Sequence, residues 1–201
     1  MEFIIKSENT AINIGISNST KLILESYKGG GYNVLDYGAG KLRNSKALIN
    51  NGFIVDILET PNQLKKISKE NLKLFNSIIS CDSKDMVKFI RKYNIVLCSF
   101  VINVIVSLDE RIDVLNSISD FLFDNGLAYI EVRGFKSILA SKNKQKYGDG
   151  YILGMGYTRT FQKPFSIDEF KSLIEESKLE IVDIKKYSDS FVAICKKGVA
   201  V

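Results

Sequence analysis

The hydrophobic positions of this chain follow two alternating periods from residue 33 onward. Short apolar runs are followed by segments in which apolar residues recur every three or four positions. The first kind of run is typical of buried strands and the second of amphipathic helices. The pattern predicts strands at residues 34–37, 53–59, 77–81, 95–100 and 127–133.

Helices are predicted between these strands, at residues 41–51, 61–75, 83–93 and 108–124. Gly52 suits the position after the first helix, and Pro61 suits the first turn of the second. The third would present Met86, Phe89, Ile90 and Tyr93 on one face. Asn125-Gly126 is the expected turn into the last of these strands.

The end of the chain departs from the alternation. Residues 134–164 are glycine-rich and weakly periodic. Ser166 and Glu169 form a capping box before a helix to about residue 178. Two strand-like runs, 179–187 and 190–196, then form a hairpin through Ser188-Asp189.

These elements predict an α/β fold. Strand–helix alternation indicates a doubly wound, mostly parallel, seven-stranded sheet, with the C-terminal hairpin as an antiparallel edge. We expect a single domain over residues 1–201. Residues 1–31 form its N-terminal helical segment, with a helix at 21–27, and residues 134–164 form an insertion.

The composition is that of an ordinary globular protein, with 45% hydrophobic and 25% charged residues among 201. No apolar run approaches the roughly 20 residues of a membrane span, and the N-terminus does not resemble a signal peptide. Cys81, Cys98 and Cys195 are isolated and are expected to be buried in a reducing compartment. The sequence thus predicts a cytoplasmic protein without membrane contact.

The chain contains no histidine. Imidazole metal ligands and nucleophile–histidine pairs are therefore excluded, and no metal site is expected. An enzyme without histidine needs other proton-handling groups or a cofactor that brings its own reactivity.

The candidate ligand site is the glycine turn in Val34-Leu35-Asp36-Tyr37-Gly38-Ala39-Gly40. It follows a strand at the sheet edge where open α/β folds bind ligands. Glu59, at the next strand end, is placed to accept hydrogen bonds from a ribose. Asp36 would repel a pyrophosphate and attract a cation, and Arg43 stands where dinucleotide sites have a third glycine. The turn therefore favours a cationic nucleoside. An ordinary turn, a solvated Glu59 and an Asp36 that only holds the loop are the structural alternatives.

This turn resembles the first motif of class I S-adenosylmethionine-dependent methyltransferases. Cys81-Asp82 is similar to the adenine-contacting motif of that family, and residues 95–105 resemble its strand 4 motif and following loop. Residues 125–130 resemble the entry to strand 5. The chain departs from the family at Leu42, where many members have a further glycine.

The resemblance implies S-adenosylmethionine as the cofactor and a role for each matching residue. Asp36, Gly38, Ala39 and Gly40 would lie by the methionine half, Glu59 by the ribose, Asp82 by the adenine, and Ser99 and Phe100 beneath the sulfonium. A sulfonium methyl is already activated, so the protein mainly has to orient an acceptor and exclude water.

The methyl acceptor is sought in the insertion. The segment from Arg133 to Lys163 contains seven basic residues and one acid, Asp149, a net charge of +6 in a chain of +5. Tyrosines and a phenylalanine are interleaved with them. Such a segment can bind nucleic acid through residues 133–163, or it can be a solvated lid. Arg133, Tyr157 and Arg159 are the acceptor-side catalytic candidates.

Three further observations concern the acceptor. Glu131 is, with Tyr157, a candidate for handling a proton, and Asn103 is a candidate acceptor contact. The absence of a proline motif after residue 99 disfavours the known DNA amino-methyltransferase patterns, and no Pro-Cys nucleophile is present for cytosine C5 chemistry.

The leading prediction is a methyltransferase with an unidentified anionic acceptor: a nucleic acid, a nucleotide or a phosphorylated metabolite. Two alternatives stand beside it. One is a non-catalytic module that binds nucleic acid or a protein partner, and the other is an NAD-dependent oxidoreductase.

Overall fold

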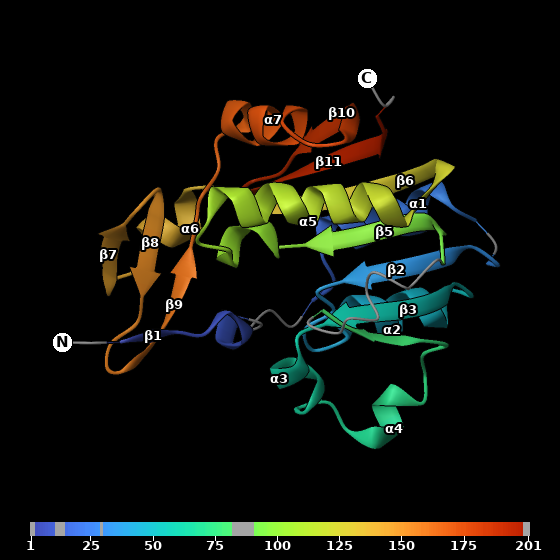
Figure 1. Cartoon of the computed structure of the whole chain (residues 1–201), viewed down its shortest axis with the longest axis horizontal. Coiled ribbons are helices and arrows are strands. Elements are labelled where there is room, and N and C mark those ends of the chain that lie inside the picture. The colour runs from blue at the N-terminus through green and yellow to red at the C-terminus, as the bar shows by residue number, and fades with distance from the viewer. Residues whose placement is uncertain (1–2, 11–14, 29, 82–90, 199–201) are drawn as a thin grey trace.

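The computed structural model describes residues 3–10, 15–28, 30–81 and 91–198. Its main feature is a seven-stranded sheet with the spatial order β10-β11-β6-β5-β2-β3-β4 (Figure 1). In chain order the strands are β2 (Asn33–Tyr37), β3 (Ile54–Glu59), β4 (Ile78–Ser80), β5 (Tyr93–Ser99), β6 (Leu122–Arg133), β10 (Leu179–Lys186) and β11 (Ser190–Lys197). The predicted seven strands and their order along the chain are confirmed.

Strand direction sets where a ligand can bind. The strands from β6 to β4 pair in parallel, and β11 is antiparallel to both of its neighbours, β6 and β10. The hairpin is therefore present, but its reversed strand lies one place in from the edge. The chain moves from β2 outward to β4 and then returns to β5 on the other side of β2. This change of direction makes the carboxyl ends of β2 and β5 a topological switch point, where such sheets bind ligands.

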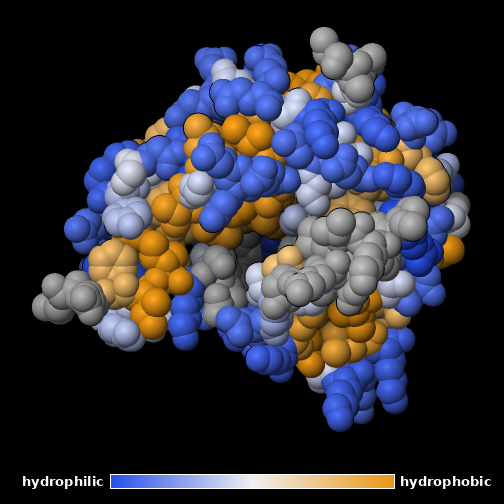
Figure 2. Space-filling model, in the orientation of Figure 1, coloured by the Kyte–Doolittle hydropathy of each residue, from blue (hydrophilic) through white to orange (hydrophobic). Residues whose placement is uncertain are grey.

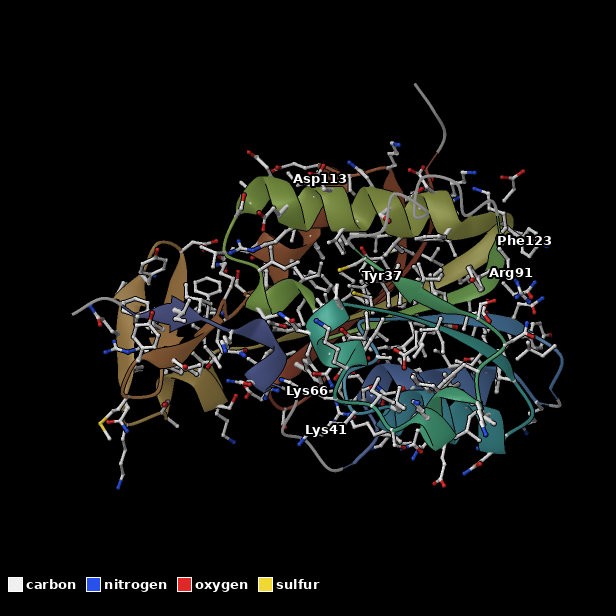
Figure 3. All side chains as sticks on the ribbon, turned by 60° about the horizontal axis from the view of Figure 1, so that its bottom comes forward. Tyr37, Lys41, Lys66, Arg91, Asp113 and Phe123 are labelled. Carbon is white, nitrogen blue, oxygen red and sulfur yellow. The ribbon has the colours of Figure 1, made fainter. Side chains whose placement is uncertain are left out.

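Helices cover both faces of the main sheet (Figure 1). The core on one face joins α1 (Asn18–Ser26) and α2 (Arg43–Asn50) to the sheet, and the core on the other joins α5 (Leu108–Phe121) and α7 (Ile167–Glu175). Tyr37 points into the layer under α5, whereas Asp113 lies on the outer face of that helix (Figure 3). The predicted capping box of α7 is confirmed.

Two predicted helices near the surface differ in extent. The helix expected over residues 61–75 is two short ones, α3 (Pro61–Leu64) and α4 (Lys69–Leu72), because Ser68 accepts from the amide of Asn71 and starts a new helix. The N-terminal helix begins three residues early, since Ser17 is its N-cap. The helix predicted from residue 83 falls largely outside the described residues.

Tyr93 and Gly126 take other roles than predicted. Tyr93 begins β5, fully buried, and its hydroxyl donates to Asp56 Oδ2 at 2.8 Å, so it does not extend the preceding helix. Asn125-Gly126 is not a turn, because β6 runs through it. A Cβ on Gly126 would lie 2.8 Å from the carbonyl oxygen of Tyr93, so the glycine permits close approach of two strands.

Residues 134–164 are not an irregular loop. They fold into α6 (Lys136–Leu139), β7 (Lys144–Tyr147), β8 (Gly150–Leu153) and β9 (Thr158–Gln162). With β1 (Ile4–Ile5) these strands form a second sheet, ordered β1-β9-β8-β7, beside the main one (Figure 1). We call it the small sheet. Local periodicity could not predict it, because β9 completes its pairing with a strand from the other end of the sequence.

Two side chains fasten the small sheet to the main domain. Arg111 of α5, 1% exposed, forms a two-pronged ion pair with Asp149 in the turn between β7 and β8, at 2.5 and 3.0 Å. Asn103 in η2 (Ile102–Val104) donates to the carbonyl of Lys163 at 2.5 Å and accepts from the amide of Arg133 at 2.8 Å. The acid of the insertion is therefore an anchor, and Asn103 is a buried structural residue instead of the predicted acceptor contact.

Candidate active site

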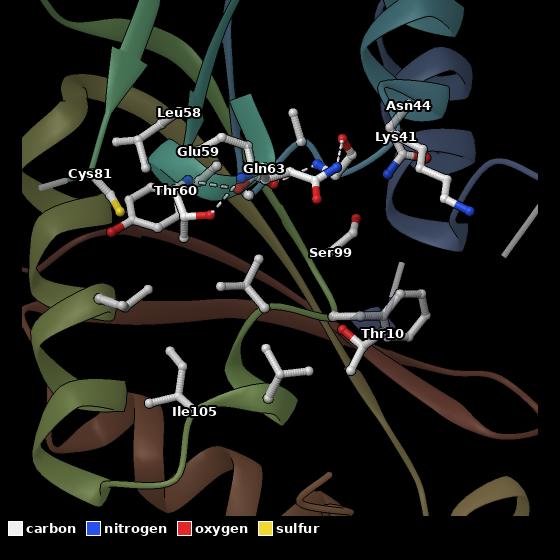
Figure 4. A pocket seen from close by; sticks show the side chains of 18 of the residues that line it. Thr10, Lys41, Asn44, Leu58, Glu59, Thr60, Gln63, Cys81, Ser99 and Ile105 are labelled. Carbon is white, nitrogen blue, oxygen red and sulfur yellow. Dashed lines mark hydrogen bonds between the residues drawn. The ribbon is translucent and has the colours of Figure 1, made fainter. Parts of the chain in front are cut away.

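A cavity of about 660 Å³ opens at the switch point, at the carboxyl ends of β2, β3 and β5. The space-filling view shows the molecule hollowed between the small sheet and the main body (Figure 2). The volume falls within the range of roughly 300–1,000 Å³ that is typical of small-molecule sites. One wall comes from the glycine turn and β3, and the other from the segment after β5, from α5 and from β1 (Figure 4).

The glycine turn lines the cavity and needs both of its glycines. Gly38 has φ +77° and Gly40 has φ +57°, backbone conformations that are unfavourable for any residue with a Cβ atom. A Cβ on Gly38 would lie 2.3 Å from Cγ2 of Val101, so the turn packs directly against the segment after β5. Gly38, Ala39 and Gly40 all contribute to the wall, where the sequence placed them.

Leu42 explains the departure from the family motif. It precedes α2 with φ +63°, the left-handed conformation that a glycine would adopt with less strain. Its side chain is 2% exposed and packs in the core with Leu48 and Ile57. This burial offsets the backbone strain, so the chain keeps the turn without a third glycine.

Glu59 lies at the centre of the polar wall (Figure 4). Its carboxylate accepts from the amide of Gly40 at 2.6 Å and from that of Thr60 at 2.8 Å. Gln63 donates to the carbonyl of Gly40 at 2.8 Å, while its own Oε1 is buried with no hydrogen-bond partner in the described residues. The wall thus presents carboxylate and amide oxygens to a ligand that brings hydroxyl or amino groups.

Asp36 does not lie on the cavity wall formed by the described residues. It is 1% exposed, beneath the turn, and Oδ2 accepts from the hydroxyl of Ser45 in α2 at 2.5 Å. This contact agrees with the structural alternative, in which the carboxylate of Asp36 holds the start of the next helix. The prediction that Asp36 repels a pyrophosphate is therefore not supported by the position of this carboxylate.

Burial of Asp36 makes the stability of the protein depend on pH. Desolvation raises the pKa of this carboxyl to about 7. The hydrogen bond from Ser45 lowers the pKa, and the negative charge of nearby Glu59 raises it further. In the unfolded chain an aspartate ionises near pH 4. The folded state therefore keeps a proton that the unfolded state has lost, and stability falls as pH rises through this interval.

We expect the free energy of unfolding to decrease by about 3 kcal/mol between pH 5 and pH 8, out of a total of about 4 kcal/mol between pH 3 and pH 8. Asp36→Asn should flatten this dependence, and few other groups titrate there because the chain has no histidine. Urea denaturation at several pH values measures it. A dependence that is equally steep in Asp36→Asn would contradict this assignment.

Ser99 ends β5 and Phe100 follows it, and both line the cavity. Their place beneath the sulfonium stays a prediction. Phe100 has φ +61°, which turns the chain sharply into the second wall. The hydroxyl of Ser99 lies 2.7 Å from that of Ser19 and donates to that of Ser17 at 3.0 Å, so the N-terminus of α1 fixes it. Backbone strain at a buried strand end is common in ligand sites.

Glu131 supports the same helix end. It is fully buried, and its oxygens accept from the amide and hydroxyl of Ser19, each at 2.9 Å, from Ser190 at 2.8 Å and from Asn18 at 3.1 Å. A carboxylate at a helix N-terminus is stabilised by the helix dipole. These contacts make Glu131 a structural anchor of α1, and it does not line the cavity.

The three acceptor-side candidates are not brought together. Arg133 lines the cavity, and its guanidinium lies over the ring of Phe100 at 4.7 Å. Tyr157 is 65% exposed before β9, and Arg159 stacks on Phe3 at 4.7 Å and donates to Gly156. Neither residue lines the cavity, although Arg159 pairs in the small sheet with Ile5, which does.

Two other predicted features differ or cannot be compared. Asp82 lies outside the described residues, so its proposed contact with adenine stays a prediction. Cys98 and Cys195 are buried as predicted, but Cys81 is exposed and lines the cavity beside Leu58 (Figure 4).

Sequence reasoning missed the second wall. It is formed by apolar side chains after β5 and on α5 and β1: Val101, Val104, Ile105, Val106, Val114 and Ile5. The apolar run after residue 100 was the available signal, because such a run past a strand end needs a surface to cover. The anchoring role of Arg111 carried no signal, since its partner Asp149 is distant in sequence.

The described residues contain no cluster of three side chains suited to bind a metal ion and no helix with the length and hydropathy to cross a membrane. No protein-family model matches the chain, and no curated protein matches it in sequence. Its similarity to known proteins is found in the fold.

Solved structures resemble this chain over most of its length. An S-adenosylmethionine-dependent methyltransferase from Clostridium acetobutylicum superposes with a TM-score of 0.67 at 13% identity, over 90% of this chain and 91% of that one. One from Methanosarcina mazei gives 0.67 at 15%, over 93% and 100%. The 1,6-didemethyltoxoflavin-N1-methyltransferase of Burkholderia thailandensis gives 0.64 at 16%, over 90% and 78%.

These likenesses concern the fold. The chain has the Rossmann-like fold of class I S-adenosylmethionine-dependent methyltransferases, with the reversed strand β11 between β6 and β10. The family resemblance of the glycine turn and the architecture therefore agree.

Proposed function

We propose that this protein is an S-adenosylmethionine-dependent methyltransferase that acts on an anionic acceptor. The observation that carries the proposal is the position of the glycine turn and Glu59, which face one cavity at the switch point of a methyltransferase-type sheet. A cytoplasmic location is part of the proposal, in keeping with the buried thiols of Cys98 and Cys195.

The residues of the polar wall fit this cofactor. Glu59 offers carboxylate oxygens to the ribose hydroxyls, and Gln63 offers a buried Oε1 that lacks a donor in the described part of the chain. Gly38 and Gly40 leave the backbone open to close approach beside them. Asp36 would act from beneath the turn, by holding α2 in place.

When bound, S-adenosylmethionine would supply a methyl group that its sulfonium activates toward an acceptor lone pair. The protein has to hold the acceptor in line and exclude water. Ser99 and Phe100 form the base of the cavity where the two walls meet, and the apolar second wall keeps water from the reacting groups.

The oxidoreductase alternative is disfavoured by the sheet. The reversed strand β11 lies between β6 and β10, the solved structures reported above that superpose on this chain are methyltransferases, and Arg43 replaces the third glycine of a dinucleotide site. Arg43 also donates to the carbonyl of Gly15 at 2.8 Å, so it occupies the start of α2.

A nucleic-acid-binding module is a second candidate, favoured by the small sheet. Lys163 is paired with Glu169, but Lys144 and Lys146 of β7 are exposed, as are Lys136 and Lys142 in the segment before it. Such a surface would bind phosphates in a salt-dependent way. A salt-sensitive gel shift without methyl transfer would favour it.

Methyl transfer is tested directly with labelled cofactor. The protein is incubated with methyl-labelled S-adenosylmethionine and a fractionated cell extract, and the label is followed into DNA, RNA, protein and small molecules. Protein-dependent label in any fraction supports a methyltransferase. Binding of a nucleic acid with no label in any fraction would favour the second candidate instead.

Glu59→Gln should weaken binding of S-adenosylhomocysteine by about 10- to 100-fold, since one charged acceptor of roughly 1.5–3 kcal/mol is replaced by an amide. Calorimetry on the variant and the parent protein measures the change. Glu70→Gln, on an exposed position of α4, is the matched control and should leave affinity unchanged. Equal affinity in Glu59→Gln and the parent would exclude Glu59 from the ribose site.

A further inference from the structure

The second wall of the cavity has a chemistry of its own. Its surface is hydrocarbon from Val101, Val104, Ile105, Val106 and Val114, and Ile5 of β1 closes it on the side of the small sheet. Two charged side chains, Arg133 and Glu110, stand beside these residues. A ligand part that lies here must therefore be mostly apolar.

Among the described residues, no anionic side chain forms an ion pair with Arg133. Its ring stacking on Phe100 holds the guanidinium in place, and Asn103 fixes the backbone of the same residue. Within the described residues this guanidinium has no hydrogen bond and no ion pair, whereas Arg43 donates to Gly15 and Arg111 to Asp149. Burial lowers the pKa of Arg133, which is the expected effect of a desolvated charge that lacks a close partner.

The negative charges near Arg133 do not satisfy it. Asp189 and Glu131 act on it from a distance, and the oxygens of Glu131 already accept from α1 and Ser190. Asp189 accepts from the amides of Lys136 and Ser137 at 2.8 and 2.9 Å. The free donors of Arg133 are thus available to a ligand in the cavity.

A guanidinium presents a planar fork that matches a carboxylate through two parallel hydrogen bonds. A phosphate monoester carries almost two negative charges and three acceptor oxygens, which one fork does not cover, and Glu110 on the same wall would repel the second charge. Among the described residues, the small sheet contributes Ile5 to the lining of this space. The exposed lysines of the small sheet do not line it.

We propose that the methyl acceptor is a small carboxylate with an apolar or aromatic body, held by Arg133 through its carboxylate and packed against Val104, Ile105 and Val106. The proposal rests on the proposed function and narrows its anionic acceptor to one class. Arg133 is a specificity-determining contact here, on the side of the cavity opposite to Glu59.

The test measures binding to protein saturated with S-adenosylhomocysteine. The probes are two matched pairs, 4-hydroxybenzoate against 4-hydroxybenzamide and indole-3-carboxylate against indole-3-carboxamide. We expect the acid of at least one pair to bind at least tenfold tighter than its amide. Arg133→Gln should abolish that preference with unchanged affinity for S-adenosylhomocysteine, Arg133→Lys should restore part of it, and Lys144→Gln should leave it intact.

Each of the remaining results contradicts either this proposal or the proposed methyltransferase function. Amides that bind as tightly as both acids, or a preference that survives in Arg133→Gln, would remove Arg133 from acceptor binding. Loss of S-adenosylhomocysteine affinity in Arg133→Gln alone would assign this arginine to the carboxylate of the cofactor. Failure of the parent protein to bind S-adenosylhomocysteine would instead reject the proposed function. Thermal unfolding of each variant identifies any that fail to fold.

Discussion

Gly38→Ala should lower the affinity for S-adenosylhomocysteine at least tenfold and destabilise the protein by about 1–3 kcal/mol. Two physical effects add at this residue. The backbone has φ +77°, and the new Cβ would lie 2.3 Å from Cγ2 of Val101. The turn and the segment after β5 must then separate, which changes both walls of the cavity. Calorimetry and urea denaturation measure the two effects.

Two further variants separate strain from contact. Gly156→Ala has a similar φ of +87° with nothing within 4 Å of the new Cβ, so it should reproduce the strain without the loss of affinity. Val101→Ala in the Gly38→Ala background removes the clashing methyl and should recover part of the affinity. Full affinity in Gly38→Ala would contradict the placement of the ligand against this turn.

Arg111→Met should destabilise the protein by about 2–4 kcal/mol, because it removes the donor to two backbone carbonyls and the partner of the half-exposed Asp149. The guanidinium donates to the carbonyls of Ile105 and Val106, each at 2.9 Å, and to Asp149. Methionine fills a similar volume but leaves all of these acceptors without a donor. Urea denaturation measures the loss. Affinity for S-adenosylhomocysteine should change little in the folded protein, because Glu59 and the glycine turn lie on the opposite wall.

The controls for this prediction are the partner of Arg111 and a second, exposed ion pair of α5. Asp149→Asn should cost less than Arg111→Met, since Asp149 is 46% exposed and Arg111 keeps its two carbonyl partners. Lys178→Met removes an exposed pair with Asp120 and should cost about 0–1 kcal/mol. If Arg111→Met costs no more than Lys178→Met, the small sheet does not depend on this anchor.

The main sheet could be predicted from sequence because each of its elements carries its own signal. Buried parallel strands read as apolar runs, and helices such as α5 read as periodic ones with a capping residue. The glycine turn and Glu59 were predictable for a related reason. Parallel strands end at the same sheet edge, so residues that follow β2 and β3 must lie close together.

The remaining features depend on contacts between distant residues. The small sheet forms because β1 pairs with β9 across more than half of the sequence, and Arg111 reaches Asp149 from another element. The place of Asp36 before the glycine turn could be predicted from the sequence, but its hydrogen-bond partner could not. Only the packing of α2 shows that the hydroxyl of Ser45 donates to the carboxylate beneath the turn.

Calorimetric titration of the protein with S-adenosylhomocysteine and, separately, with NAD tests the central claim most directly. The account predicts saturable binding of S-adenosylhomocysteine that Glu59→Gln weakens, and no binding of NAD. Binding of NAD without binding of S-adenosylhomocysteine would contradict it.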